Sequence, residues 1–137
     1  MKNFNLKLIT PAGVAFEGEA SEISLPTPDG QITVLANHEP IISLLSPGEI
    51  VMHQNGKPQY LATEGGVVEI ANNLVKIMAD TAESAESLDE AKIEEAKRAA
   101  KIKMTNAKDN LDFASAEAVL EKQLAKLRVL KRRRKYK

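Results

Sequence analysis

Cysteine and tryptophan are absent from the 137-residue sequence, and aromatic residues make up only 4% of it. Without cysteine there is no disulfide, no thiolate nucleophile and no cysteine-type zinc site, a pattern that fits a reducing compartment. Hydrophobic residues, at 43%, suffice for a modest core, which must then be aliphatic. The length predicts one domain, or a small domain with an appendage.

Motifs of catalysis, metal binding and membrane insertion are missing too. There is no Gly-x-x-x-x-Gly-Lys-Ser/Thr loop, no Gly-x-Ser-x-Gly elbow and no His-Glu-x-x-His pair. With only His38 and His53 available, a metal site needs an unusual gathering of carboxylates. No apolar run approaches the roughly 18 residues that cross a bilayer, and the N-terminus lacks a secretion pattern. We expect a soluble, unprocessed protein that is not an enzyme by itself, holds no metal and does not insert directly into a bilayer.

Charge is divided between the two parts of the chain, although the formal net charge is zero. Residues 1–84 hold 4 basic against 10 acidic residues, net −6, whereas residues 85–137 hold 15 basic against 9 acidic residues, net +6. Such opposite halves predict two surfaces with different partners. A cluster of cations near the C-terminus, called the basic tail below, comprises Lys126, Arg128, Lys131, Arg132, Arg133, Arg134 and Lys135.

Short runs of alternating hydrophobicity predict strands over residues 4–80. A polar corner at 37–40 joins two such runs, and Asn55-Gly56 is a strong hairpin signal because both residues tolerate positive φ. We expect a loop at 26–30, where two prolines remove donors from a strand ladder. Strands at intervals of about 8 to 12 residues favour an antiparallel sandwich or a flattened barrel.

Beyond Ser87 the sequence has neither glycine nor proline and takes on the composition of helices. Ser87 and Glu90 suit a capping box that starts a first helix. This helix loosens near Thr105, and a second helix runs from an N-cap at Asp112 to about Arg134. Residues of the second helix recur at spacings of 3 and 4, namely Phe113, Ala116, Leu120, Gln123, Leu127 and Leu130. They predict a thin seam against alanines of the first helix, and thus an antiparallel hairpin of marginal stability on its own.

The fold expected from these patterns is α+β, with an antiparallel β-sandwich domain at residues 1–84 and an antiparallel two-helix hairpin domain at residues 85–137. A series of short motifs accompanies it along the chain: Asp29-Gly30-Gln31-Ile32, Asn37-His38-Glu39-Pro40, Pro47-Gly48-Glu49-Ile50, Glu64-Gly65-Gly66, Ala79-Asp80-Thr81-Ala82, Leu88-Asp89-Glu90-Ala91 and Leu127-Arg128-Val129. In this order the motifs resemble the ε subunit of bacterial-type F-type ATP synthases, and the resemblance covers essentially the whole chain.

The resemblance implies a rotor component that clamps the γ subunit to the proteolipid c-ring, so that torque from proton flow reaches the catalytic α and β subunits. It assigns Gln31, His38 and Glu39 to the ring interface, although family members often carry an acidic residue at the position of Gln31. Gly65 and Gly66 fall at the γ interface. From the residue types alone, the two glycines predict a backbone with positive φ or a close approach of strands. His38 is predicted to be a turn residue whose imidazole forms a hydrogen bond with nearby backbone.

The resemblance also implies a conformational brake and a location at the cytoplasmic face of the plasma membrane, as a peripheral part of the complex. Extended along γ, the hairpin brings the basic tail to acidic segments of β and inhibits ATP hydrolysis. Folded on the sandwich, it permits rotation. Alternatively, the basic tail is a solvated helix end, whose positive charges complement the negative C-terminal end of the helix dipole.

A regulatory ATP site is a further implication, because Leu88, Asp89 and Lys92 lie where some bacterial relatives bind ATP. Lys92 replaces an arginine and lacks its bidentate grip, so we expect weak ATP binding or none, and no other cofactor. Alternatively, the carboxylate of Asp89 is simply a favourable negative charge at a helix N-terminus. Two other functions stay open: a stand-alone nucleotide sensor, and a β-sandwich adaptor whose basic arm binds nucleic acid or an acidic protein. The acidic first half and the scarcity of aromatic residues weigh against nucleic acid.

Overall fold

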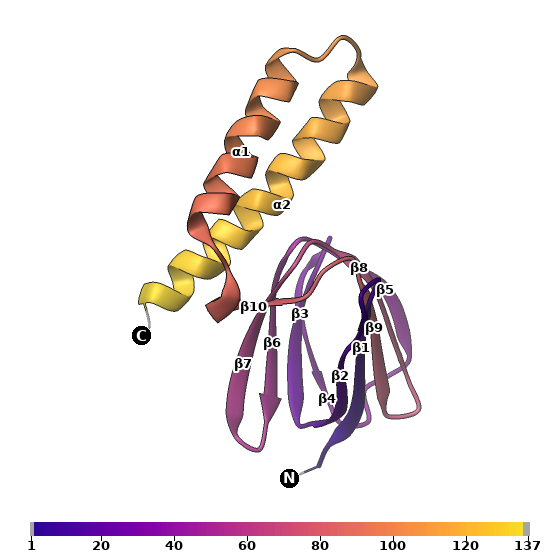
Figure 1. Cartoon of the computed structure of the whole chain (residues 1–137). Helices are drawn as coiled ribbons and strands as arrows, with labels where there is room; N and C mark the ends of the chain where they lie inside the picture. Colours follow the sequence, from indigo (N-terminus) through magenta and orange to yellow (C-terminus); the bar gives the residue numbers. More distant parts are fainter. Residues whose placement is uncertain (1, 136–137) are drawn as a thin grey trace.

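The computed structural model describes residues 2–135, which form two sheets packed face to face and a helical hairpin (Figure 1). Sheet A has the strand order β2-β1-β9-β8-β5, and sheet B has the order β10-β7-β6-β3-β4. Sheet A consists of β1 (Phe4–Thr10), β2 (Gly13–Ala20), β5 (Ile41–Leu45), β8 (Gly66–Ala71) and β9 (Leu74–Ala79). Sheet B consists of β3 (Glu22–Thr27), β4 (Gly30–Leu35), β6 (Gly48–Gln54), β7 (Lys57–Thr63) and β10 (Glu83–Ser84). The antiparallel sandwich is confirmed, with β1 and β9 as a parallel pair inside it.

The core lies between the two sheets and is mainly aliphatic, as the composition predicts. In β1, Phe4, Leu6 and Leu8 are at most 2% exposed while Asn5 between them faces solvent, because successive side chains of a strand point to opposite faces. The other large side chains in the core include Ile23, Leu25, Ile50, Met52, Ile70 and Ile77.

Two connections between strands follow the sequence signals. Asn55 and Gly56, with φ of 53° and 76°, join β6 to β7 as a two-residue hairpin, as predicted. The polar corner at 36–40 carries the chain from the edge of sheet B to the edge of sheet A, from β4 to β5. It is held by the backbone N–H of Asn37, which donates to Oδ1 of Asn73 at 2.8 Å. Both expected strands of this stretch therefore exist, and the corner is the crossing between the sheets.

The loop expected at 26–30 is shorter in the structure. Pro26 belongs to β3 and pairs with Gln31 in β4, so that the turn itself is reduced to Pro28 and Asp29. A proline fits there because the pairing of β3 with β6 ends at Ser24, and beyond it no strand on that side needs an N–H from Pro26. Missing donors therefore do not exclude a proline from the end of a strand.

Two helices follow the strands, and the antiparallel hairpin is confirmed: α1 spans Glu90–Thr105 and α2 spans Asn110–Lys135. Both predicted N-caps are wrong. Ser87 ends a short 3-10 helix, η1 (Ala85–Ser87), and its hydroxyl donates to the carbonyl of Ser84. Because extended Leu88 separates Ser87 from α1, the capping oxygen is that of Asp89, which accepts from the N–H of Lys92 at 3.3 Å.

The start of α2 differs from the prediction in the same way. The carboxylate of Asp109 accepts the N–H of Asp112 at 2.7 Å, so Asp112 lies inside the first turn instead of capping it. Of the predicted seam, Ala116, Gln123, Leu127 and Leu130 are buried and Leu120 is half-buried, as expected for a face of α2 that packs against other elements. The two helices pack along each other, and Ile93 and Ala100 are buried on α1. Phe113 does not join the seam, because it is 42% exposed near the tip of the hairpin.

Candidate interaction surfaces

The C-terminal half of α2 lies on the outer face of sheet B, next to β6 and β7 (Figure 1). Val129 is 3% exposed and packs with Ala62 of β7 and Ala85 of η1, and Tyr60 and Leu88 border the same cluster. Successive side chains of a strand point to opposite faces. In β7, Leu61 therefore points into the core between the sheets, and Ala62 points outward to α2. The apolar part of this contact is small, since two of its three buried members are alanines.

Glu49 holds the arginines near the end of α2. Its side chain is only 7% exposed, its Oε1 accepts from Nη1 of Arg132 at 3.0 Å, and its Oε2 lies 3.2 Å from Nε of Arg133. The guanidinium of Arg133 stacks on the ring of Tyr60, 3.6 Å from its centroid, as a cation–π contact. One carboxylate and one aromatic ring of the sandwich thus hold two cations of the basic tail.

Lys126 pairs with two more carboxylates of the sandwich, about two turns nearer the tip of the hairpin than the arginines. Its ammonium lies 3.1 Å from Glu64 and 3.3 Å from Glu83, and its side chain is 13% exposed. Burial lowers the pKa of Lys126, but the hydrogen bonds and negative charges of Glu64 and Glu83 outweigh that effect, so its pKa lies above the usual value of 10.5. The ammonium therefore stays charged at neutral pH and bridges β7 and β10 to α2.

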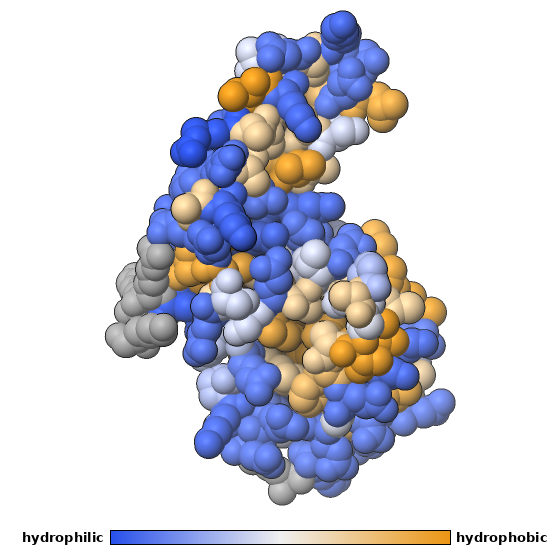
Figure 2. Space-filling view, viewed as in Figure 1, coloured by the Kyte–Doolittle hydropathy of each residue, from blue (hydrophilic) through white to orange (hydrophobic). Residues whose placement is uncertain are grey.

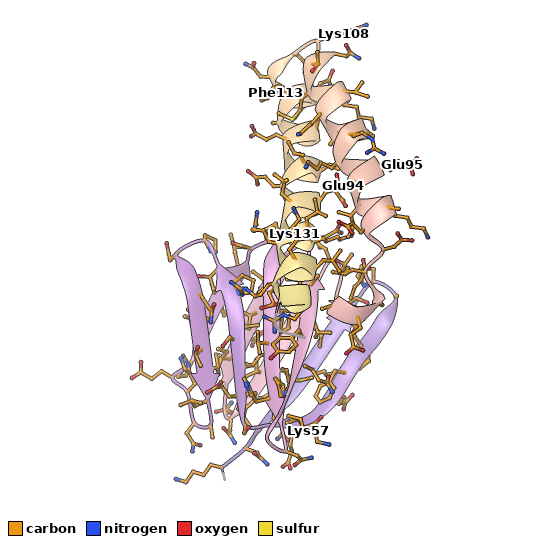
Figure 3. The ribbon with its side chains drawn as sticks, turned by 90° about the vertical axis from the view of Figure 1, so that its left-hand side faces the viewer. Lys57, Glu94, Glu95, Lys108, Phe113 and Lys131 are labelled. Atoms are coloured by element: carbon orange, nitrogen blue, oxygen red, sulfur yellow. The ribbon has the colours of Figure 1, made fainter. Side chains whose placement is uncertain are left out.

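The remaining cations of the basic tail face elsewhere. Arg128 and Lys131 are exposed, and Figure 3 shows Lys131 on α2 above the sandwich. Arg134 and Lys135 continue the backbone of α2, but their side chains lie outside the described part of the chain. The structure thus divides the predicted tail into cations that are engaged with the sandwich and cations that are accessible.

The residues assigned to the ring interface do not lie together. His38 and Glu39 belong to the corner after β4, where Nδ1 of His38 lies 2.7 Å from the carbonyl oxygen of Glu39, so the histidine bonds nearby backbone as its simpler reading predicts. Gln31 lies at the other end of β4, about 13 Å away along the strand at roughly 3.3 Å per residue. A partner that contacts all three therefore has to span the length of β4.

Gly65 and Gly66 are required by backbone geometry. A Cβ on Gly66, whose φ is 151°, would lie 2.1 Å from the carbonyl oxygen of Met78, and a Cβ on Gly65, with φ of 123°, would lie 3.0 Å from that of Leu45. These contacts confirm the close strand approach inferred from the sequence. Their assignment to the γ interface stays a prediction.

The outer face of sheet A carries an exposed apolar row that the sequence did not reveal. Cross-strand neighbours place Leu44 beside Val67, Val67 beside Met78, Met78 beside Ile9 and Ile9 beside Val14, with Ile42 next along β5. Ile42 is 75% and Leu44 63% exposed. Figure 2 shows hydrophobic residues gathered on the side of the sandwich that bears β5 and β8. In the described part of the chain no helix covers this row, whereas α2 covers part of sheet B.

The predicted ATP residues lie beside one hollow. Leu88, Asp89 and Lys92 line a space of about 360 Å³ between η1, α1 and α2, together with Glu83 and Lys126. Glu83 and Lys126 are paired with each other, and the carboxylate of Asp89 caps α1. Lys92 is therefore the cation of this lining that could bind a phosphate group in addition to Lys126. ATP binding stays a prediction.

The described residues offer neither a metal site nor a membrane-spanning helix. Within residues 2–135, no group of three or more histidine, aspartate or glutamate side chains lies close enough to hold a metal ion. No helix in this range combines the length and the apolarity that crossing a membrane requires.

Four residues that the structure brings to the surface under α2 had no assigned role: Glu49, Tyr60, Glu64 and Glu83. The opposite net charges of the two halves indicated that the sandwich and the hairpin would attract each other. The net charges alone do not predict which acidic residue pairs with which basic residue.

A β-sandwich with a helical hairpin docked on one outer face is the class of protein that this fold and these surfaces define. The profile of the family described as the β-sandwich domain of the ATP synthase delta/epsilon chain matches residues 3–85. The ATP synthase epsilon chain of Acidithiobacillus ferridurans is 33% identical over 95% of this chain and 92% of its own length. That of Herpetosiphon aurantiacus is 36% identical over 94% of this chain and 95% of its own length. The chain belongs to the ATP synthase epsilon-chain family.

Solved structures share the fold. A chain in the cryo-EM structure of Euglena gracilis mitochondrial ATP synthase matches with a TM-score of 0.82 and 24% identity, covering 93% of this chain and 81% of that chain. A chain of the central stalk and c-ring structure of Tetrahymena thermophila mitochondrial ATP synthase matches with a TM-score of 0.64 and 15% identity, covering 94% and 97%. At these identities the likeness establishes the fold alone.

Proposed function

We propose that the chain is a non-catalytic rotor subunit in the central stalk of a proton-translocating F-type ATP synthase. It joins the γ subunit and the proteolipid c-ring to the catalytic α and β subunits, and its hairpin inhibits ATP hydrolysis when it leaves the sandwich. As part of that complex it is held peripherally at the cytoplasmic face of the plasma membrane.

The observation that carries the proposal is the apolar row on sheet A. Exposed and half-buried apolar side chains contiguous across five strands are expected at a protein interface. The family membership makes γ the partner that fits, and we propose this row, with Gly65 and Gly66 shaping the adjacent backbone, as the γ surface. His38, Glu39 and Gln31 are left for the c-ring.

The nucleic-acid adaptor is less well supported. A nucleic-acid arm needs accessible cations, and in the described residues Lys126, Arg132 and Arg133 are engaged with carboxylates of the same chain. Retention of the isolated chain on DNA with no affinity for γ would favour the adaptor.

The experiment is a pull-down from a bacterial membrane extract with the full chain as bait. We expect recovery of γ together with α and β. The variant Ile42→Asp/Leu44→Asp should lose γ, because two charges would be placed in the apolar row. Its matched control is Leu35→Asp, which changes a leucine of 53% exposure on β4 of the other sheet and should retain γ. Recovery of γ by both variants would remove the row from the interface, and no recovery by the unmodified chain would reject the proposed function.

A further inference from the structure

The cations that the proposed brake needs are partly occupied when the hairpin lies on the sandwich. Lys126, Arg132 and Arg133 each have an acidic partner on the outer side of sheet B, within 3.3 Å. These partners come from separate elements: Glu49 is the second residue of β6, Glu64 directly follows β7 and Glu83 lies in β10. Three separate segments of the sandwich thus contribute a carboxylate to one helix.

The best-formed part of this contact is the pair of arginines on Glu49. The carboxylate is 7% exposed and the side chain of Arg133 is 18% exposed, so this pair is shielded from solvent and salt more than an ordinary surface pair. Tyr60 lies under the guanidinium of Arg133 and removes one of its faces from water. A planar cation held by a carboxylate and a ring is a specific fit that lysine would not reproduce.

The apolar share of the same contact is limited. Its fully buried members are Ala62, Ala85 and Val129, which together remove little hydrocarbon from water compared with the core between the sheets. Charge pairing therefore decides where α2 rests. A change in one carboxylate should shift the resting position without disturbing the sandwich.

We propose that Glu49, Glu64 and Glu83 form an internal acidic site that masks Lys126 and Arg133 and pairs with Arg132, whose side chain stays 57% exposed, so that the two masked cations reach an acidic partner only after the hairpin leaves sheet B. This inference rests on the proposed function for the identity of that partner, but not for the masking itself. The sandwich and the partner compete for the same three side chains. Arg128 and Lys131, which are exposed while α2 is docked, can make the first contact, and Arg132 is exposed beside them although it is paired with Glu49.

The first test measures docking in the isolated full chain. Because the sequence has no cysteine, Lys57→Cys and Lys108→Cys give two unique spin-label positions, at the far turn of the sandwich and at the tip of the hairpin (Figure 3). We expect one narrow distance distribution in this labelled chain. Glu49→Gln, which keeps the shape of the side chain and removes its charge, should raise the undocked fraction about tenfold, because it leaves shielded Arg133 without its anion.

Two further variants separate this effect from a general loss of stability. Arg132→Gln/Arg133→Gln should open the hairpin to a similar extent while leaving the sandwich sequence intact. Glu17→Gln changes an exposed carboxylate on β2 of sheet A and should leave the distribution unchanged. An unchanged distribution in both Glu49→Gln and the double arginine variant would overturn the acidic site, whatever the function of the chain.

The second test compares ATP hydrolysis by the assembled ATP synthase between the two variants that are expected to open the hairpin. Glu49→Gln frees the cations and should lower ATP hydrolysis about threefold or more, whereas Arg132→Gln/Arg133→Gln opens the hairpin but removes two of the cations and should not lower it. Equal hydrolysis by the two variants, after both have opened in the isolated chain, would overturn the masking. Failure of the chain to assemble with γ would instead reject the proposed function and leave the distance measurement standing.

Discussion

The core between the sheets and the surface that holds α2 are built from different interactions. In the core, side chains from both sheets are excluded from water, and Leu25, Ile50, Val68 and Ile77 have no measurable exposure. Under α2, three carboxylates hold three cations around a cluster of two alanines and one valine. Apolar burial adds up over a large area, whereas partly exposed ion pairs are individually weak. The sandwich can therefore stay folded while the hairpin changes its place.

The largest effect should come from the core. Leu25→Ala removes a fully buried side chain and should lower the free energy of unfolding by about 2–5 kcal/mol, measured by urea denaturation. The matched substitution Leu111→Ala changes a residue of 75% exposure on α2 and should cost less than about 0.5 kcal/mol. Similar losses in the two variants would contradict the difference between core and hairpin.

A smaller effect is expected where the ion pairs hold α2. Lys126→Met leaves Glu64 and Glu83 without their cation and should weaken docking by about 1–3 kcal/mol. Hydrogen exchange should show it as faster exchange in the C-terminal half of α2, with β6 and β7 unchanged. Lys131→Met, an exposed neighbour, serves as the control. Protection lost equally from the strands would mean that hairpin and sandwich open as one unit.

The ring of Tyr60 should contribute less than Lys126. Tyr60→Leu removes the aromatic face under Arg133 and should weaken docking by about 0.5–1 kcal/mol, as expected for a cation–π contact of moderate exposure. Tyr60→Phe keeps the face and should leave docking unchanged in the same exchange measurement. If Tyr60→Phe loses as much as Tyr60→Leu, the hydroxyl and not the ring is the stabilising group.

Alkaline pH should release the hairpin gradually. The pKa of Lys126 is raised in the folded chain above its value of 10.5 in the unfolded chain, so its stabilising effect is complete below pH 10.5 and is lost as the pH rises through the folded-state pKa. Docking followed by spin-label distances should weaken over that alkaline range. In Lys126→Met this component should be missing, and an identical pH profile in both chains would assign the release to other groups.

ATP should have the smallest effect. With Lys92 as the additional cation of the hollow near Leu88, a dissociation constant near 1 mM would stabilise the docked hairpin by only about 0.4 kcal/mol at 1 mM ATP. Calorimetry with Mg-free ATP measures it directly. Lys92→Arg supplies a bidentate guanidinium and should bind more tightly than the unmodified chain. Micromolar binding by the unmodified chain would show that the hollow is a better site than its residues suggest.

Much of the fold could be predicted because its signals are local. Alternation marked the strands, Asn55-Gly56 marked a hairpin, and the loss of glycine and proline after Ser87 marked the helices. The errors were local as well. Ser87 and Asp112 have good capping residue types, but one extended residue, Leu88, and one earlier carboxylate, Asp109, moved both helix starts. The division into folding units at 1–84 and 85–137 stays a prediction.

The candidate surfaces were harder to predict. Gly65 and Gly66 were understood from their residue type, and the basic tail from its composition. The apolar row was missed because its members come from five strands, and each strand shows only one or two exposed residues. The separation of Gln31 from His38 was missed although the strand between them was predicted, because the resemblance assigned residues of two separate motifs to one interface and the length of that strand was not considered.

The sequence by itself determined the class of fold, the turns with positive φ, the aliphatic core and the opposite charges of the two halves, since each depends on residue type and short-range spacing. Only the tertiary structure decided which charges meet. Glu49 and Arg132 are 83 positions apart, and their contact exists because β6 and α2 are packed together. Strand order and helix placement follow from burying apolar area over the whole chain, and no short segment contains that information.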